Sequence, residues 1–267
     1  DKRGHMYIIG ELINGMYVSI TRAIKTRDEE IIRKCALDQI AAGADALDVN
    51  CGPGSKQPAD DIRWLVKTIR SVTDKTIVLD SSKPGVIEAG LEAATGPVMI
   101  NSTTADAAKL SVLVPLAKKY NASLIGLAMN AKGVPQNKDQ RLELAATIVA
   151  TCVENDFPVD NLYLDPIVMP VNVSQAAMAD ILESIREFKI ISEPPPKTVV
   201  GLSNVSQGTQ FRSLINRTFL VMAVAFGLDA AILDPLDKEL MDALITAELI
   251  VNKQIYCDSY LEAYRKK

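Results

Sequence analysis

The chain has 267 residues, 48% of them hydrophobic and 23% charged, with a formal net charge of −4. This length and composition indicate one large globular domain or two small ones. The acidic balance argues against a nucleic-acid or anionic-membrane partner, and no apolar run approaches the ~20 residues of a transmembrane helix. No secretory signal is visible, so we expect a protein of the reducing cytoplasm.

Five polar residues, DKRGH, precede the first methionine of the chain. We expect residues 1–5 to be the remnant of an expression vector, with the native chain starting at Met6. This matters because His5 is the only histidine, and without it the protein has no imidazole for general-base chemistry or metal binding. The four cysteines have the spacing of neither a zinc site nor a disulfide framework.

The sequence contains eight short apolar runs, and each leads into a polar residue at or just after its end. Short runs of this kind, rich in β-branched residues, are typical of buried strands. The expected strands are residues 6–9, 44–49, 76–79, 97–100, 123–129, 162–164, 197–202 and 230–233.

Helical patterns fill the segments between these runs. Asp28 can cap a helix that stops before Gly43, and Pro84 suits the first turn of another helix. Apolar residues at helical spacing predict further helices over residues 62–69, 110–120, 142–154, 176–188, 219–226 and 238–254.

Alternating strands and helices over about 260 residues predict a (β/α)8 TIM barrel. A doubly wound sheet would also alternate, but no G-x-G-x-x-G motif follows the first strand. No linker rich in Pro, Gly or Ser divides the chain, so we expect residues 6–267 to form one barrel domain. We expect residues 254–267 to form a last helix that closes it.

The carboxyl ends of barrel strands form the active face of this fold. In this chain the side chains at those ends are carboxylates and amides, with neither His nor Lys among them. They are Glu11, Asp48, Asn50, Asp80, Asn101, Asn130, Asp165, Asn204 and Asp234.

Three kinds of site can be compared with this set of residues. Clustered carboxylates bind Mg²⁺ or Ca²⁺, but amides are weak ligands and a transition metal would lack His or Cys partners, so we expect no metal. A Schiff-base aldolase needs a lysine at a strand end, whereas Lys83 and Lys132 lie in loops and Lys197 begins its strand. The third site is a pocket for a flat, neutral heterocycle rich in hydrogen-bond donors, because carboxylates accept such bonds in pairs.

A structural role stays open for each of these residues, since an Asp at a strand end often caps the following helix. That explanation is weaker for Asp80, Asn101 and Asp165 taken together than for any one of them. Glu11 is more suggestive of function, because we expect no helix directly after it to cap.

Several segments resemble the pterin-binding barrels. Within them, the chain is most similar to the methyltetrahydrofolate:corrinoid protein methyltransferases, over residues 7–264. LDSS, INST and DP are shared with dihydropteroate synthase and with the folate domain of methionine synthase, whereas GLSNVSQ and NRTFL are more specific. The segments are GELING (10–15), ALDVNCG (46–52), LDSS (79–82), INST (100–103), YLDP (163–166), GLSNVSQ (201–207) and NRTFL (216–220).

The resemblance implies an enzyme that moves the N5 methyl group between methyltetrahydrofolate and the cobalt of a separate corrinoid protein. It implies that Asp80, Asn101 and Asp165 bind the pterin ring. Asn204 matches the catalytic amide that approaches N5, and Gln207 lies beside it in the substrate site. The resemblance also implies positions near the pocket for Glu11, Asn14 and Asp48.

The family binds no permanent cofactor, since the corrinoid is carried by the partner protein, and it tends to form homodimers. The apolar segment 219–227 is either internal or part of such a dimer interface. Arg212 and Arg217, expected in the loop after strand seven, either meet the folate glutamate tail or an acidic partner, or are solvated charges.

Two alternatives remain: a dihydropteroate synthase-like enzyme and a non-catalytic folate-binding protein. The first would place a lysine at the end of strand seven and an arginine near the end of strand eight. The chain has Ser203-Asn204 and Leu233-Asp234 there, and it lacks a D-x-H-x-x-G cobalt-binding motif. The direction of methyl transfer and the corrinoid partner stay open.

Overall fold

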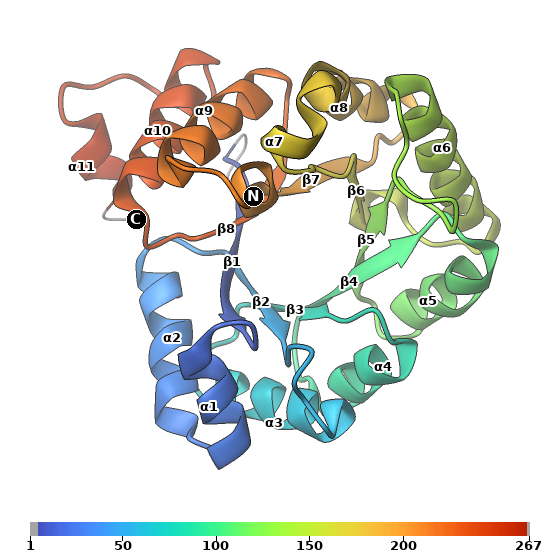
Figure 1. Ribbon diagram of the computed structural model, residues 1–267, viewed down its shortest axis with the longest axis vertical. Helices are drawn as coiled ribbons and strands as arrows, with labels where there is room; N and C mark the ends of the chain where they lie inside the picture. The colour runs from blue at the N-terminus through green and yellow to red at the C-terminus, as the bar shows by residue number, and fades with distance from the viewer. Residues whose placement is uncertain (1–4, 266–267) are drawn as a thin grey trace.

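The structure is a computed structural model that describes residues 5–265. Eight parallel strands form one closed barrel in which every strand pairs with the next along the chain and β8 pairs with β1. Helices surround the barrel (Figure 1), so the predicted (β/α)8 TIM barrel is confirmed. The strands are β1 (Tyr7–Asn14), β2 (Ala46–Asn50), β3 (Thr76–Asp80), β4 (Val98–Thr104), β5 (Ser123–Leu127), β6 (Leu162–Asp165), β7 (Lys197–Gly201) and β8 (Ala230–Leu233).

Side chains on one face of each strand point into the barrel, where they form a small apolar cluster. Because successive side chains of a strand alternate between its faces, the opposite face packs against the helices in a second, larger cluster. Burial of this apolar surface is the main source of the stability of the barrel. The interior cluster consists of Ile9, Ala46, Val78, Met99, Ile125, Tyr163, Val199 and Ala230.

Most helices begin close to the expected signals. The Asp28 carboxylate accepts the N–H of Ile31 at the start of α2, and Pro84 occupies the first turn of α4. The helices are α1 (Val18–Thr26), α2 (Glu29–Ala41), α3 (Pro58–Arg70), α4 (Pro84–Ala93), α5 (Ala107–Lys119), α6 (Lys138–Glu154), α7 (Val171–Ser174), α8 (Met178–Glu187), α9 (Arg212–Ala225), α10 (Lys238–Ile250) and α11 (Tyr260–Arg265).

Helix α1 begins at Val18, shortly after β1 ends at Asn14, so no helix starts directly after Glu11, as expected. The sequence gives little sign of α1, because its N-cap residue, Tyr17, makes no side-chain capping bond. A short stripe of buried residues, which includes Ile20 and Ile24, holds α1 against the barrel. Glu11 does not cap α1, because its carboxylate accepts a hydrogen bond from Ser203 on the turn after β7.

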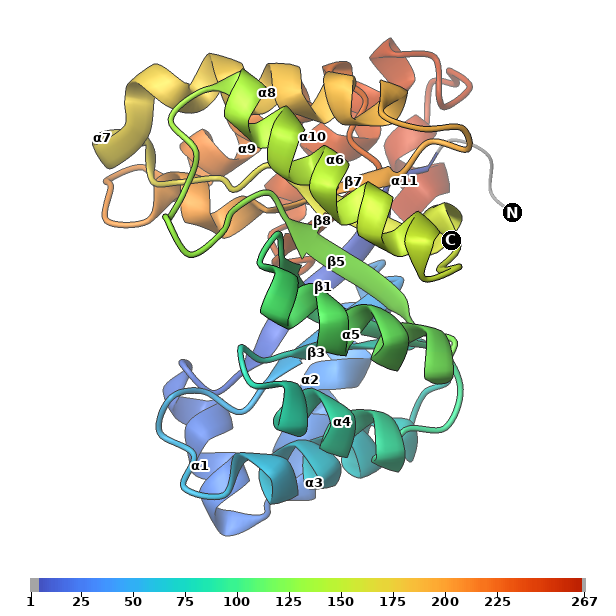
Figure 2. The ribbon, with the colours of Figure 1, turned by 90° about the vertical axis from the view of Figure 1, so that its right-hand side faces the viewer.

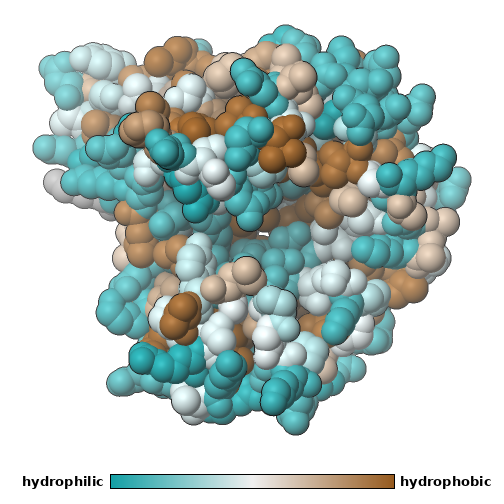
Figure 3. All heavy atoms as spheres, in the orientation of Figure 1, coloured by the Kyte–Doolittle hydropathy of each residue, from teal (hydrophilic) through white to brown (hydrophobic). Residues whose placement is uncertain are grey.

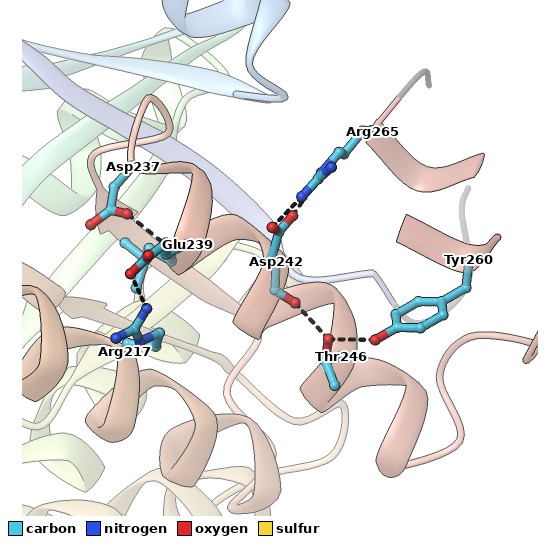
Figure 4. A network of polar contacts seen from close by, with 8 residues as sticks. Arg217, Asp237, Glu239, Asp242, Thr246, Tyr260 and Arg265 are labelled. Atoms are coloured by element: carbon cyan, nitrogen blue, oxygen red, sulfur yellow. Dashed lines mark hydrogen bonds and ion pairs between the residues drawn. The ribbon is translucent and has the colours of Figure 1, made fainter. Parts of the chain in front are cut away.

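The C-terminal segment differs from its prediction. Instead of a continuous helix over 254–267, the structure has only the six-residue α11, which buries no side chain of its own, while residues 266–267 lie outside the described part. Polar contacts tie α11 to α10 (Figure 4): Arg265 Nε donates to Asp242 over 2.7 Å, and the Tyr260 and Thr246 hydroxyls lie 3.0 Å apart. A segment without an apolar stripe cannot gain helix stability from packing.

Different segments of the chain lie at the two ends of the barrel. Figure 2 shows α1 and α7 at one end and α11 toward the other. The expected vector remnant falls mostly on residues 1–4, outside the described part, but His5 Nδ1 lies 2.8 Å from Oε2 of the buried Glu248. His5 therefore lies at the amino ends of the strands, away from the predicted active face. Between residues 5 and 265, every helix is too short or too polar to cross a bilayer.

Candidate active site

Polar side chains form a ring inside the barrel mouth. Two residues beyond each member of the interior apolar cluster, strand geometry brings the next side chain to the inside of the barrel. On three strands this position holds Leu127, Gly201 or Ile232, and on the other five it is polar. We call these five polar residues the mouth ring: Glu11, Asp48, Asp80, Asn101 and Asp165. Figure 3 shows a hollow at the centre of the molecule, with hydrophilic residues on its floor.

Hydrogen bonds connect the ring on the β2–β4 side. Asn101 Nδ2 donates to Asp48 Oδ1 over 3.0 Å, and Asn50 Nδ2 donates to Asp80 Oδ2 over 2.7 Å. Strand register also pairs Asp80 directly with Asn101. These amides fix the carboxylates in place while leaving part of their acceptor capacity for a ligand.

Asp165 differs from the other carboxylates of the ring because its partners among the described residues are backbone N–H groups and not side chains. It is only 8% exposed, and its Oδ1 accepts the backbone N–H of Ile167 over 2.7 Å. Burial raises the pKa of Asp165 to about 7, although backbone N–H groups of Ile167 and Gly201 oppose the change. The bond to Ile167 is a local turn contact, so Asp165 supports its own loop as well as facing the mouth.

Burial also raises the pKa values of the other acids in the ring. It acts on Glu11, Asp48 and Asp80, and in Asp48 the negative charges of Asp80 and Glu11 add to the effect. The one nearby cation that lowers any of these pKa values is Arg212, which acts on Glu11. A site with surplus acceptors and little positive charge suits a neutral ligand that brings N–H donors, and it disfavours an anion.

Asn204 lies beside the ring, on the short 3₁₀ turn η4 (Leu202–Ser206) that follows β7. Its side chain is exposed and makes no hydrogen bond to any described residue. A Cβ on Gly201 would lie 3.0 Å from Asn204 Nδ2, so the glycine leaves the space that this amide needs. Gln207 is also exposed, and its backbone N–H donates to the Asn204 carbonyl over 3.2 Å.

The η4 turn is held from two sides. Ser203 Oγ donates to Glu11 Oε1 over 2.7 Å, which joins the turn to β1. Arg212 at the start of α9 donates to the Ser203 carbonyl over 3.3 Å and to Ser206 Oγ over 3.1 Å. These contacts fix the backbone on both sides of Asn204. Glu11, Ser203 and Arg212 also line a side cavity of about 300 Å³, together with Asp234.

The chain matches the model of a known protein family. The family model described as pterin binding enzyme matches residues 10–234. The chain belongs to the pterin-binding enzyme family. This confirms the resemblance read from the motifs, and it covers every member of the mouth ring and the η4 turn.

Individual relatives of this pterin-binding enzyme can be compared with it in sequence. It is 26% identical to the methylcorrinoid:tetrahydrofolate methyltransferase of Eubacterium limosum, over 98% of this chain and 97% of that protein. It is also 26% identical to the methionine synthase of Mycobacterium leprae, over 84% of this chain but only 20% of that protein. The chain therefore spans about a fifth of that methionine synthase and nearly all of the first relative.

Solved structures agree on the fold. Dihydropteroate synthase of Yersinia pestis with a pterine-sulfa conjugate has a TM-score of 0.67 at 18% identity, covering 94% of this chain and 96% of that chain. A dihydropteroate synthetase with a product gives 0.69 at 18% identity over the same shares. At this level of identity the likeness establishes the barrel and nothing about the reaction.

Some expected site residues of this pterin-binding enzyme also make local contacts. Asn130 Oδ1 accepts the N–H of Lys132, and Asn14 Oδ1 accepts that of Met16. Arg212 and Arg217 lie in α9 rather than in a loop, which corrects the expectation for both. Arg217 pairs with Glu239 on α10 (Figure 4).

The sequence patterns miss the residues that support the site. Ser203 and Gly201 act through their positions around Asn204, and Arg212 donates to the Ser203 carbonyl of the turn. The ring residues follow from the sequence as polar strand ends, but these supporting contacts do not. Among residues 5–265, no three His, Cys, Asp or Glu side chains are grouped so that they could hold a metal.

Proposed function

We propose that this pterin-binding enzyme moves the N5 methyl group between methyltetrahydrofolate and the cobalt of a separate corrinoid protein. The observation that carries the proposal is the Asn204 amide, which has no hydrogen-bond partner among the described residues and lies at the end of β7 beside a ring of four buried or half-buried acids and an amide. The near full-length match to the methylcorrinoid:tetrahydrofolate methyltransferase supports the same reaction.

The mouth ring accounts for recognition of the pterin. A pterin carries an exocyclic amine beside a ring N–H, and one carboxylate can accept both hydrogen bonds. Asp80, Asn101 and Asp165 surround the edge of the pterin ring. Glu11 and Asp48 supply the remaining polar side chains of the mouth ring. Each buried acceptor that lacks a donor in the free protein gains one from the ligand, which makes binding selective for this heterocycle.

The chemistry is a displacement at the methyl carbon. When the methyl group leaves the folate, the N5–C bond breaks and a cobalt–carbon bond forms with electrons from the reduced cobalt. N5 keeps the electron pair of the broken bond and takes up a proton. Asn204 donates a hydrogen bond to N5 as negative charge develops there, and a donor whose bond strengthens in the transition state raises the rate. An amide does not deliver a proton, so the proton comes from solvent, with Asp165 as the buried acid suited to relay it.

The other properties of the enzyme follow from this reaction. It needs no permanently bound cofactor, because the corrinoid arrives on its partner. Assembly as a homodimer in the cytoplasm is part of the proposal, and the exposed Val221 and Met222 on α9 offer apolar surface for a second subunit. In the segment 219–227, Phe219 and Leu220 face the core instead.

Two assays on one preparation separate this function from its alternatives. A methyltransferase converts methyltetrahydrofolate and free cob(I)alamin to tetrahydrofolate and methylcobalamin. A dihydropteroate synthase instead condenses hydroxymethyl-dihydropterin pyrophosphate with 4-aminobenzoate, and a carrier does neither. We expect only the first product, since β7 ends in Ser203-Asn204 rather than in a lysine.

The corrinoid partner needs a docking surface at the mouth, and exposed apolar side chains gather around it. They lie in the loops and helix starts that follow strands β1, β6, β7 and β8, and Figure 3 shows hydrophobic residues along the upper edge of the central hollow. These residues are Met16, Tyr17, Val18, Val173, Phe211, Leu214 and Leu236. Exposed apolar patches of this kind commonly mark protein–protein interfaces.

Phe211 tests this surface, because it is 78% exposed and precedes α9 beside the η4 turn. We expect Phe211→Glu to lower methyl transfer to the corrinoid protein at least tenfold, the scale of one interface anchor. Transfer to free cob(I)alamin should stay within twofold of wild type. Ile250→Glu, at an equally exposed position at the end of α10, is the matched control. Equal loss with both acceptors would show that Phe211 serves the site itself rather than docking.

A further inference from the structure

A second cavity lies just outside the mouth ring, between α1 and the loop from β2 to α3. Its volume is about 450 Å³. Its apolar lining includes Ile24 and Cys51, and its charged groups are Lys25, Arg27, Lys56 and Asp61. Burial raises the pKa of the Cys51 thiol to about 12, so the thiol is neutral and contributes no charge.

The walls of this cavity are tightly built. The β1–α1 and β2–α3 loops meet at two glycines, and a Cβ on Gly15 would lie 2.1 Å from the Cys51 carbonyl oxygen. Behind them, the buried Asp61 accepts hydrogen bonds from Arg27 over 2.6 Å and from Ser55 over 2.5 Å. The shape is therefore fixed by backbone contact and by a charged network, not by loosely placed surface side chains.

The charge of the cavity is opposite to that of the mouth. Asp61 balances Arg27, whereas Lys25 and Lys56 are exposed and pair with no acid among the described residues. The cavity thus has a surplus of two positive charges. The side cavity near η4 has the reverse balance, with Arg212 facing Glu11, Asp234 and Asp237. An anionic group attached to a ligand in the mouth would be repelled there and attracted here.

The lining of the cavity is also connected to the mouth ring along the chain. Asn50, which donates to Asp80, is the residue directly before Cys51 in the cavity lining. We propose that this cavity binds the γ-linked glutamate tail of polyglutamylated folates, an inference that rests on the proposed function. Each added glutamate carries one carboxylate on a short aliphatic stem, which matches two unpaired lysines over an apolar floor.

The test compares methyltetrahydrofolate carrying one, three and five glutamates, with affinities measured by calorimetry at low ionic strength. We expect the pentaglutamate to bind wild type roughly tenfold more tightly than the monoglutamate, because two exposed charge pairs are gained and little screened. The double variant Lys25→Ala/Lys56→Ala should lose this preference while binding the monoglutamate normally. The control Lys67→Ala/Lys109→Ala changes net charge equally at two lysines that do not line the cavity and should keep it.

The outcomes separate this inference from the function on which it rests. If the monoglutamate binds wild type but longer tails bind no more tightly, the tail site is refuted and the proposed function stands. Retention of the full preference by the Lys25/Lys56 variant would also refute it. A wild type that binds no folate of any length would overturn the proposed function and this inference together.

Discussion

Replacing Asn204 with alanine should lower the rate of methyl transfer about 100-fold, the scale of one lost transition-state donor. The reason is that Asn204 is the one residue of the η4 turn whose side-chain amide is both exposed and free of partners in the described structure. The loss should fall on the single-turnover rate with saturating folate, measured anaerobically by stopped flow. Folate affinity should change less than fivefold, because the mouth ring still holds the pterin.

Gln210→Ala is the matched control for this variant, since Gln210 is another exposed amide shortly after the same turn. It should react at the wild-type rate. An Asn204→Ala enzyme with an unchanged single-turnover rate would remove Asn204 from the mechanism. A variant that lost folate affinity in proportion to its rate would mean that Asn204 binds the ground state and transition state equally.

Replacing Asp165 with asparagine should have opposite effects on binding and on stability. The asparagine presents an N–H group where the carboxylate accepts two hydrogen bonds, so folate affinity should fall at least 100-fold. The bond from the Ile167 N–H can persist to the amide oxygen, so the loop should keep its conformation. Calorimetric titration of the variant with methyltetrahydrofolate measures the loss.

The stability effect depends on pH. The carboxyl of Asp165 has a pKa of about 7 in the folded protein, compared with about 3.9 in an unfolded chain. The folded state therefore binds the proton more tightly, and the free energy of unfolding falls as the pH rises from about 4 to 7. The ligand-free Asn variant should be about 2 kcal/mol more stable than wild type at pH 8, with the gap closing toward pH 4.

Urea unfolding of both proteins at pH 5 and pH 8 measures this difference. Asp160→Asn changes an exposed carboxyl and should leave stability unchanged at both pH values. A wild type that is more stable than the Asp165 variant at pH 8 would show that the carboxylate is stabilised by contacts other than those described. A variant with normal folate affinity would reduce Asp165 to a loop-capping role.

The sequence predicts the barrel well because each strand contributes a short run of buried apolar residues. The strand ends are less predictable, since polar residues continue several strands into the mouth. β1 runs to Asn14 rather than stopping at Ile9, and β4 runs to Thr104. A polar residue marks the end of a strand only where the interior is a core, and in this protein we propose that the upper interior is a binding site.

The candidate site shows the same limit. The identity of the ring residues follows from their places at strand ends, but their pairing does not. The bond from Asn101 to Asp48 and the bond from Ser203 to Glu11 join side chains far apart in the sequence. Such pairs depend on the register between strands and on the path of the loops, which the pattern of one chain does not specify.

The most direct test of the central claim is to mix the protein anaerobically with methyltetrahydrofolate and free cob(I)alamin and to follow the visible spectrum. The account predicts conversion to methylcobalamin, with tetrahydrofolate formed in equal amount. Absence of conversion with free cob(I)alamin and with every corrinoid protein tested, while methyltetrahydrofolate still binds tightly, would contradict it and leave a folate-binding protein without methyl transfer.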